Sequence, residues 1–280
     1  MSIVLAALSS LLWGTGDFIG GSVARRAHVL AVTLGSQAAG FGLLIVVVLV
    51  TGSDVSAGGV AFGAAAGLVG AFALAVFYRA LALGVMSLVA PLSATGAIVP
   101  VVVALARGDE VGTLALVGMA VAIAGAVGCG LVPGAVVLTR QALGLAAVAA
   151  LGIGSFLALI QLGSQADGSS GPGAVLAARA AGSSAALVVV LSLRGAPMRG
   201  VAGRTLLTIL SIGLMDASAN LLFAVASEAR DGGAVVAVIG SLYPLMTLLL
   251  AFVLHGERLV RLQALSVVAA LGGAALAGAA

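Results

Sequence analysis

An uninterrupted apolar run near the end of the chain constrains the fold more than any other feature. Residues 234–254 are 21 residues without a charge, a polar segment at 255–258 follows, and a second apolar run continues from Leu262 to the end. At about 1.5 Å of rise per residue, a helix of this length crosses the roughly 30 Å hydrocarbon core of a bilayer. The pattern predicts a helical hairpin that spans a membrane twice, and the whole chain resembles five such hairpins.

The composition excludes a water-soluble domain. Of the 280 residues, 62% are hydrophobic and only 8% are charged, which is too few charges to cover a soluble surface. All 12 basic residues are Arg and occur singly or in pairs between apolar runs, so we expect no nucleic-acid partner. The single Cys excludes an internal disulfide. The sequence therefore predicts an all-α integral membrane protein whose surroundings are the lipid bilayer.

Apolar runs of spanning length recur along the whole chain. Gly is abundant, with 41 residues, and small residues allow helices to approach closely within lipid. We predict ten transmembrane helices, numbered as spans 1 to 10 in chain order, at about 2–20, 29–50, 58–78, 85–106, 111–132, 141–162, 173–193, 205–225, 234–254 and 261–279.

Three short patterns occur in the same order in both halves of the chain. They pair residues 14–18 with 152–156, residues 37–40 with 179–182, and residues 107–110 with 255–258. We therefore predict two five-helix repeats, 1–132 and 141–280, joined by a linker at 133–140. Because five is odd, the second repeat enters the membrane with reversed polarity. Such inverted repeats are typical of secondary transporters, which expose a central site alternately to either side.

The distribution of Arg predicts the orientation of the chain in the membrane. Nine Arg residues lie in loops after odd-numbered spans, two lie in loops after even-numbered spans, and Arg179 lies inside a span. Cytoplasmic loops carry the excess of basic residues. The odd-numbered loops are therefore expected on the cytoplasmic side of the cell membrane, and both termini on the other side.

Both ends of the chain carry a recurring set of short motifs. The last hairpin contains Ser241-Leu242-Tyr243-Pro244, then Gly256-Glu257-Arg258-Leu259 and Gln263, and the first span contains Leu11-Leu12-Trp13-Gly14. Together with Arg179 in span 7, these motifs resemble the EamA-type repeat of the drug/metabolite transporter superfamily, over the whole chain. The resemblance implies ten helices, a central cavity, peripheral fifth and tenth helices, and export or exchange of small solutes.

The first half departs from this pattern at three places. Gln37 stands where the family often has Arg, Gly96 where Pro is expected, and Asp109-Glu110 where Gly-Glu is expected. The segment 13–18 is also similar to the sugar-uptake branch of the same superfamily. Uptake of a sugar or another metabolite is therefore the alternative to export.

Charged side chains within the spans are the first functional candidates, because each costs roughly 2.5–3.5 kcal/mol on insertion scales. Asp17 lies in span 1, two turns before Arg25 and Arg26. Its carboxyl group could couple transport to protons or bind a substrate ammonium group. The alternative is a local role, as a helix cap or as the partner of one of these two Arg residues.

Arg179 and Asp216 form the second candidate group. They lie in spans 7 and 8, which are consecutive and antiparallel, so their side chains could approach each other. Arg stays protonated in proteins and needs a partner. The pair could be a gate or anion site, or a structural ion pair. Asn220 follows Asp216 by one helical turn, so the two residues share a face that could form a polar stripe toward a cavity.

Uncharged polar and aromatic residues complete the candidate set. Gln37 and Gln161 could contact a solute or join helices by hydrogen bonds. Prolines in spans 4 and 9 release backbone carbonyls, which predicts weakened helices that could line a cavity. The residues beside these prolines are Ser93, Thr95 and Tyr243, and Trp13 and Tyr243 could supply an aromatic surface or pack as anchors. Glu257 and Arg258 are expected to stabilise the turn of the last hairpin.

The sequence as a whole favours a secondary transporter of small organic solutes that is proton- or exchange-coupled. No phosphate-binding loop for ATP, no metal-ligand cluster and no cofactor motif is found, so we expect none of these groups. A membrane-embedded enzyme would need clustered His, Glu or Asp residues, and the two His residues, His28 and His255, lie in unrelated loops. A passive channel, and a monomer or a homodimer, remain open alternatives.

Overall fold

The computed structural model describes residues 1–83, 89–90, 93, 95–108, 112–128, 140–228, 233–255 and 261–279, and every regular element in these ranges is helical. This confirms the predicted all-α class. Residues 133–139 of the predicted linker and the hairpin residues Glu257 and Arg258 lie outside the described residues. The elements are α1 (Ser2–Ala24), α2 (Val29–Thr51), α3 (Ala57–Leu83), η1 (Thr95–Ala97), α5 (Ile98–Ala106), α6 (Thr113–Gly128), α7 (Arg140–Ser164), α8 (Gly171–Ser192), η2 (Ala196–Met198), α9 (Gly203–Ala226), α10 (Gly233–Gly240), α11 (Tyr243–His255) and α12 (Arg261–Ala279).

Six of these helices, namely α1, α2, α3, α7, α8 and α9, are long and apolar enough to cross a membrane. Shorter apolar helical segments coincide with predicted spans 4, 5, 9 and 10; they are Thr95–Ala106, Thr113–Gly125, Ala234–Leu250 and Ala264–Gly273. Within the described residues the chain is therefore an all-α, multi-pass membrane protein.

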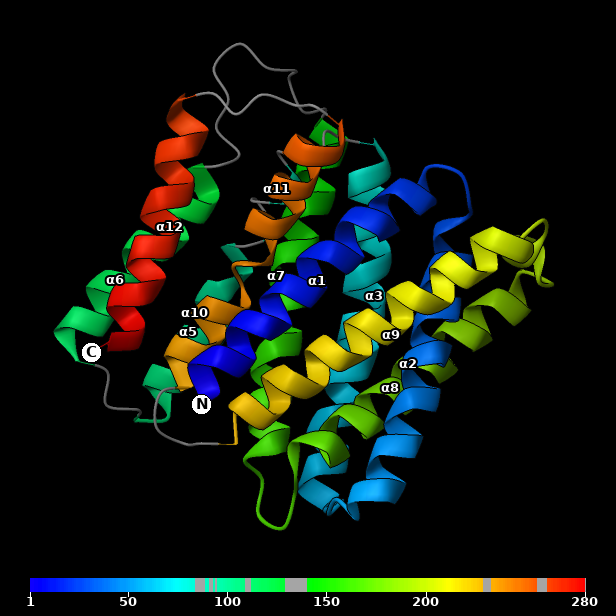
Figure 1. The fold of residues 1–280 in the computed structure, drawn as a ribbon. Coiled ribbons are helices and arrows are strands. Elements are labelled where there is room, and N and C mark those ends of the chain that lie inside the picture. Colours follow the sequence, from blue (N-terminus) through cyan, green and yellow to red (C-terminus); the bar gives the residue numbers. More distant parts are fainter. Residues whose placement is uncertain are drawn as a thin grey trace.

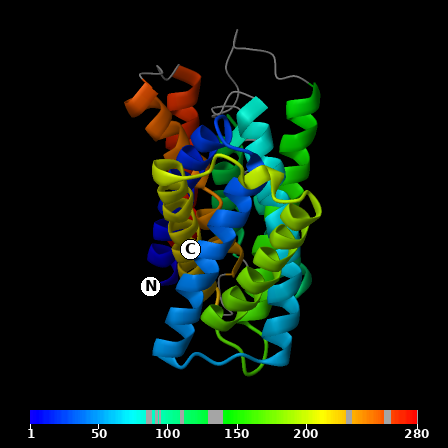
Figure 2. The same ribbon diagram turned by 90° about the vertical axis from the view of Figure 1, so that its right-hand side faces the viewer.

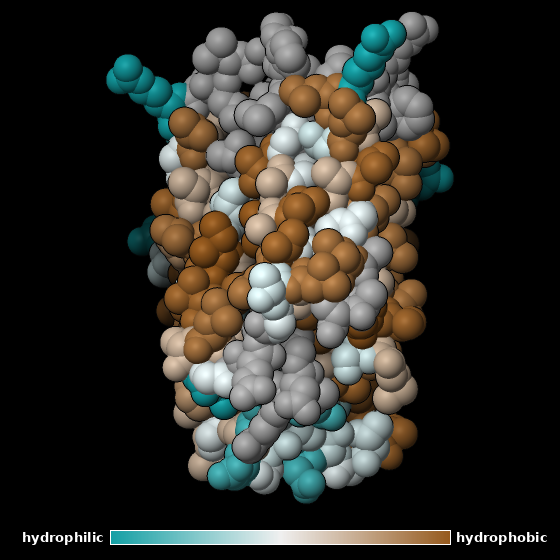
Figure 3. Space-filling view, turned by 90° about the vertical axis from the view of Figure 1, so that its left-hand side faces the viewer, coloured by the Kyte–Doolittle hydropathy of each residue, from teal (hydrophilic) through white to brown (hydrophobic). Residues whose placement is uncertain are grey.

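The outer surface matches a lipid environment. Figure 3 shows the face formed by α6 and α12, where hydrophobic residues fill the middle and hydrophilic residues lie toward the ends. Contiguous exposed apolar surface of this kind marks a membrane or protein contact. The exposed apolar side chains on this face include Leu114, Val117 and Val121 of α6 and Leu265, Val268 and Leu271 of α12.

The helices form one main bundle with a helix pair beside it (Figures 1 and 2). In the bundle, α3 packs against α7 and α8, while α9 packs against α1 and α2. Helices α6 and α12 pack mainly against each other at one edge. This edge position agrees with the peripheral fifth and tenth helices that the family resemblance implies.

Small residues bring the helix backbones together. A Cβ added to Gly67 in α3 would lie 2.0 Å from the carbonyl oxygen of Ala178 in α8. A Cβ on Gly118 in α6 would meet the backbone of α12 at Gly273 and Ala277. Helices in lipid associate through such close van der Waals packing rather than through hydrophobic burial. Gly67 and Gly118 therefore allow close packing of neighbouring helices.

Predicted span 9 is not one continuous helix. Helix α10 ends at Gly240, a turn occupies Ser241 and Leu242, and α11 begins at Tyr243. Pro244 has no N–H to donate to the Gly240 carbonyl, which interrupts the helical hydrogen bonding. Pro244 therefore interrupts this span with a turn, whereas the sequence predicted only a weakened helix. In span 4, the 3-10 turn η1 likewise directly precedes α5.

Candidate functional site

A cavity of about 70 Å³ lies in the main bundle, between α1, α2, α3, α7, α8, α9 and α11. At roughly 10–15 Å³ per water position, this space holds about five waters or a compact solute. Seven of the ten predicted site residues line it, and they are Trp13, Asp17, Gln37, Arg179, Asp216, Asn220 and Tyr243.

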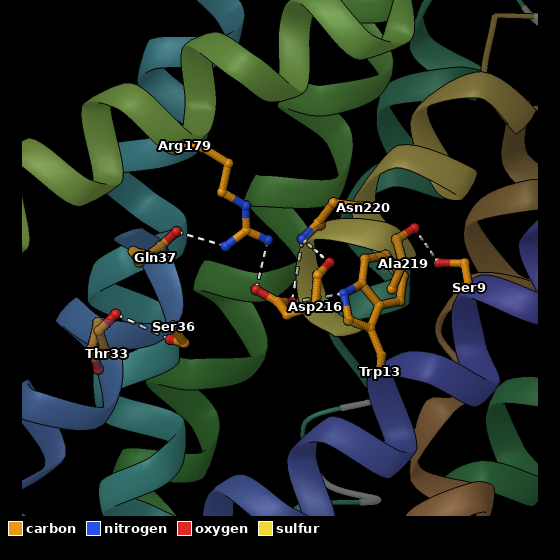
Figure 4. A network of polar contacts seen from close by, with 9 residues as sticks. All are labelled: Ser9, Trp13, Thr33, Ser36, Gln37, Arg179, Asp216, Ala219 and Asn220. Carbon is orange, nitrogen blue, oxygen red and sulfur yellow. Dashed lines mark hydrogen bonds and ion pairs between the residues drawn. The ribbon is translucent and has the colours of Figure 1, made fainter. Parts of the chain in front are cut away.

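A buried ion pair forms one wall of the cavity (Figure 4). Arg179 Nη2 donates to Asp216 Oδ2 at 2.6 Å, so the pairing that the sequence left open is present. The other terminal nitrogen of Arg179, Nη1, donates to Gln37 Oε1 at 2.6 Å. Arg179 is only 4% exposed. Its charge is therefore balanced by a carboxylate of α9 and solvated by an amide of α2.

The second carboxylate oxygen of Asp216 accepts two further hydrogen bonds. Trp13 Nε1 donates to Asp216 Oδ1 at 3.0 Å, and Asn220 Nδ2 donates to the same oxygen at 3.2 Å. Asn220 Nδ2 also lies 2.7 Å from the Asp216 backbone oxygen, one turn earlier in α9. The shared helix face predicted for Asp216 and Asn220 is thus confirmed. Through Trp13 and Gln37, the network joins the predicted first repeat to the second.

Asp17 lies apart from this network. It is buried, lines the cavity, and follows Trp13 by one turn of α1. Among the described residues, its carboxylate takes part in no ion pair and accepts no hydrogen bond. The alternative of local pairing with Arg25 or Arg26 is therefore wrong. Arg25 and Arg26 follow the end of α1 at Ala24 and are exposed, whereas Asp17 lies inside the helix and is buried.

Aromatic rings surround the charged groups. The ring centroid of Trp13 lies 5.5 Å from that of Phe223 and 6.5 Å from that of Tyr243. Tyr243 also meets Phe77 edge-on at 6.4 Å. Gly14 permits this cluster, because a Cβ there would lie 2.3 Å from the Tyr243 carbonyl oxygen. The cavity is thus lined mainly by apolar and aromatic side chains, with a few charged and polar groups among them.

Three predicted site residues lie outside the cavity lining. Ser93 supports it indirectly, because its hydroxyl lies 2.6 Å from that of Tyr243. Thr95 begins the 3-10 turn η1. Gln161 lines a separate, smaller cavity together with Gln165. Arg107 closes that second site by donating from Nη1 to Gln165 Oε1 at 3.0 Å.

Helices α3 and α7 contribute an apolar wall that was not predicted from the sequence. This wall contains Phe77, Ile153, Phe156 and Leu157. A partial signal existed, because the repeat comparison matched residues 14–18 of span 1, which include Asp17, with 152–156 of span 6. In span 3, the one side chain with a polar atom is that of Tyr78, next to Phe77, and a single polar residue did not indicate which face of the helix lines a cavity.

Comparison with known proteins gives information about the fold but not about the function. No family model matches the chain, and no curated protein does. Among solved structures, 22 chains match. One is a crystal structure of a protein with no stated function, with a TM-score of 0.73 and 17% sequence identity, covering 99% of this chain and 96% of that chain. At this identity the likeness shows a shared fold alone, over almost the full length of both chains.

Proposed function

We propose that this chain is a secondary transporter of small organic solutes, similar to EamA-type members of the drug/metabolite transporter superfamily. One observation carries the proposal: both halves of the chain line one cavity, which holds an ion pair and a further carboxylate among apolar side chains. Helices α1, α2 and α3 contribute one side, and α7, α8, α9 and α11 contribute the other. A binding site between two halves is the arrangement that alternating access requires.

In this proposal, ten transmembrane helices form two inverted five-helix repeats. Helix-by-helix correspondence would relate α1 to α7, α2 to α8 and α3 to α9. The contact of α3 with α7 and α8 then has its counterpart in the contact of α9 with α1 and α2. The contact of α10 and α11 with α1 has its counterpart in that of η1 and α5 with α7. This exchange of contacts supports a two-fold relation between the halves.

Binding of a solute would act on the links between the halves. Trp13 and Gln37 come from the first half, and both are hydrogen-bonded to the Arg179–Asp216 pair of the second. A polar solute that competes for these groups weakens the links and lowers the barrier to rocking. The carboxyl of Asp17 can exchange a proton with a solute or with water. No ATP-binding motif is present in the sequence, so a gradient would supply the energy.

The orientation in the cell membrane is part of the proposal. In Figure 1, the last turns of α1, α3 and α8 and the first turns of α7, α9 and α12 lie in the upper part of the view. These ends carry most of the Arg residues, which places them on the cytoplasmic side by the positive-inside rule. Both termini then face outward. Labelling of a Cys introduced at position 2 or 280 from outside intact cells tests this, and protection of both positions would reverse the orientation.

Solute counterflow in proteoliposomes tests the function. Proteoliposomes that contain the purified protein are loaded with a metabolite library. They should show saturable exchange of at least one small organic solute. Asp17→Asn should lose the dependence of exchange on a pH gradient, whereas Asp54→Asn, in the exposed loop between α2 and α3, should not. Flux that never saturates and shows no counterflow would indicate a channel. Exchange by Asp17→Asn with the wild-type response to pH would refute the coupling role.

A further inference from the structure

The charges that line the cavity do not balance. Three of the described lining residues carry a carboxylate or a guanidinium group: Asp17, Arg179 and Asp216. Arg179 and Asp216 neutralise each other at 2.6 Å. When Asp17 is ionised, the cavity therefore carries one uncompensated negative charge, enclosed by apolar and aromatic side chains.

Two acceptors on the cavity wall are left without donors. Trp13 Nε1, Arg179 Nη1 and Nη2, and Asn220 Nδ2 already donate to protein oxygens. The Asp17 carboxylate and Asn220 Oδ1 accept no hydrogen bond from the described residues, and Asn220 Oδ1 is buried. Buried acceptors without donors are costly. A ligand with N–H groups supplies the donors that these two acceptors lack.

The walls are suited to a positive charge. Trp13, Phe77, Phe156 and Tyr243 line the cavity. Aromatic faces attract cations through the ring quadrupole. An organic anion would meet the Asp17 carboxylate and the electron-rich ring faces, and the guanidinium of the described lining, that of Arg179, is already paired with Asp216.

From these observations we infer that the solute is a small organic cation with N–H donors, a primary or secondary ammonium ion, held by Asp17. This inference rests on the proposed transport function and names the substrate class of the same site. As the cation binds, its N–H groups donate to the Asp17 carboxylate, and a proton held there is released to water. The exchange is electroneutral at the site, because one positive charge replaces another. A cavity of about 70 Å³ limits the cation to a compact one.

A binding experiment tests the class of ligand without requiring transport. Trp13 is the only Trp in the chain and lines the cavity, so its fluorescence reports on this site. Protein in detergent micelles is titrated with butylammonium, 1-butanol and pentanoate, which carry the same butyl chain with charges of +1, 0 and −1. Calorimetry on the same samples gives an independent affinity. Butylammonium should bind at least about tenfold more tightly than the other two ligands.

Variants assign the preference to Asp17. Asp17→Asn should weaken butylammonium binding by about tenfold or more and leave 1-butanol binding nearly unchanged. Asp17→Glu, which keeps the charge, should retain the preference, and Asp54→Asn is the matched control. Equal or tighter binding of pentanoate or 1-butanol to the wild type would overturn the inference, as would wild-type binding of butylammonium by folded Asp17→Asn. Counterflow of neutral or anionic solutes only would support the transporter proposal and refute the inference that the solute is a cation. Cation binding without any counterflow would support the cation inference and refute the transporter proposal.

Discussion

Replacing Asp216 by Asn removes one charge from the cavity and keeps the shape of the side chain. In the native protein, both carboxylate oxygens face donors: Oδ2 faces Arg179, and Oδ1 faces Trp13 and Asn220. Asn offers one acceptor and one donor. Whichever way the new amide is turned, its NH2 group meets another N–H, so at least one hydrogen bond is lost and the buried guanidinium loses its counter-charge.

The expected loss can be bounded from the geometry. Removing one partner of a buried ion pair costs about 3–5 kcal/mol. The bond from Arg179 to Gln37 remains and partly solvates the charge, and the Asp216 side chain is 17% exposed. We therefore expect about 3 kcal/mol for Asp216→Asn, which is about 6–12 °C in the unfolding midpoint at roughly 2–4 °C per kcal/mol. Arg179→Gln should cost a similar amount, because it leaves the carboxylate unpaired.

A double-mutant cycle separates an ion pair from an ordinary hydrogen bond. The double variant of Arg179→Gln and Asp216→Asn leaves no unpaired charge in the network, so it should be more stable than the sum of the single effects predicts, by about 2 kcal/mol or more. Ordinary hydrogen bonds between membrane helices average only about 0.6 kcal/mol in such cycles. Unfolding in detergent, followed by Trp13 fluorescence, gives the four values. A coupling energy at or below about 0.6 kcal/mol would refute a desolvated ion pair and indicate a water-filled site.

Two further substitutions test the packing around the cavity. Gly67→Ala should destabilise the protein by about 1–3 kcal/mol, because its Cβ would overlap the Ala178 carbonyl oxygen, whereas Gly42→Ala, which has no atom within 4 Å, should change the stability by less than about 0.5 kcal/mol. Equal unfolding midpoints for these two variants would contradict the close approach of α3 and α8. Tyr243→Phe should lower the free energy of unfolding by only about 1 kcal/mol, since Ser93 keeps its hydrogen bond to a backbone carbonyl. A loss of several kcal/mol in thermal unfolding would mean that this hydroxyl has a structural role beyond that one bond.

The membrane character and the positions of the six long helices followed from the sequence alone. The predicted span at 29–50 corresponds to α2, and the one at 205–225 corresponds to α9, each within two residues at either end. Such boundaries depend on local properties, because the length of an apolar run and its flanking polar residues decide whether a segment can cross hydrocarbon. The cost of burying charge likewise indicated Asp17, Arg179 and Asp216 as site candidates before any fold was known.

Only the tertiary structure decided which of these residues meet. Arg179 and Asp216 are 37 positions apart, and Trp13 and Asp216 are 203 apart, yet all three belong to one network. The residues near Asp17 in the sequence did not show whether its carboxylate pairs with Arg25 or lies unpaired in a cavity. The rotation of each helix about its axis makes that distinction, and close contacts such as that of Gly14 with Tyr243 set the rotation. These contacts form between segments remote in the chain, so periodicity and composition do not contain them.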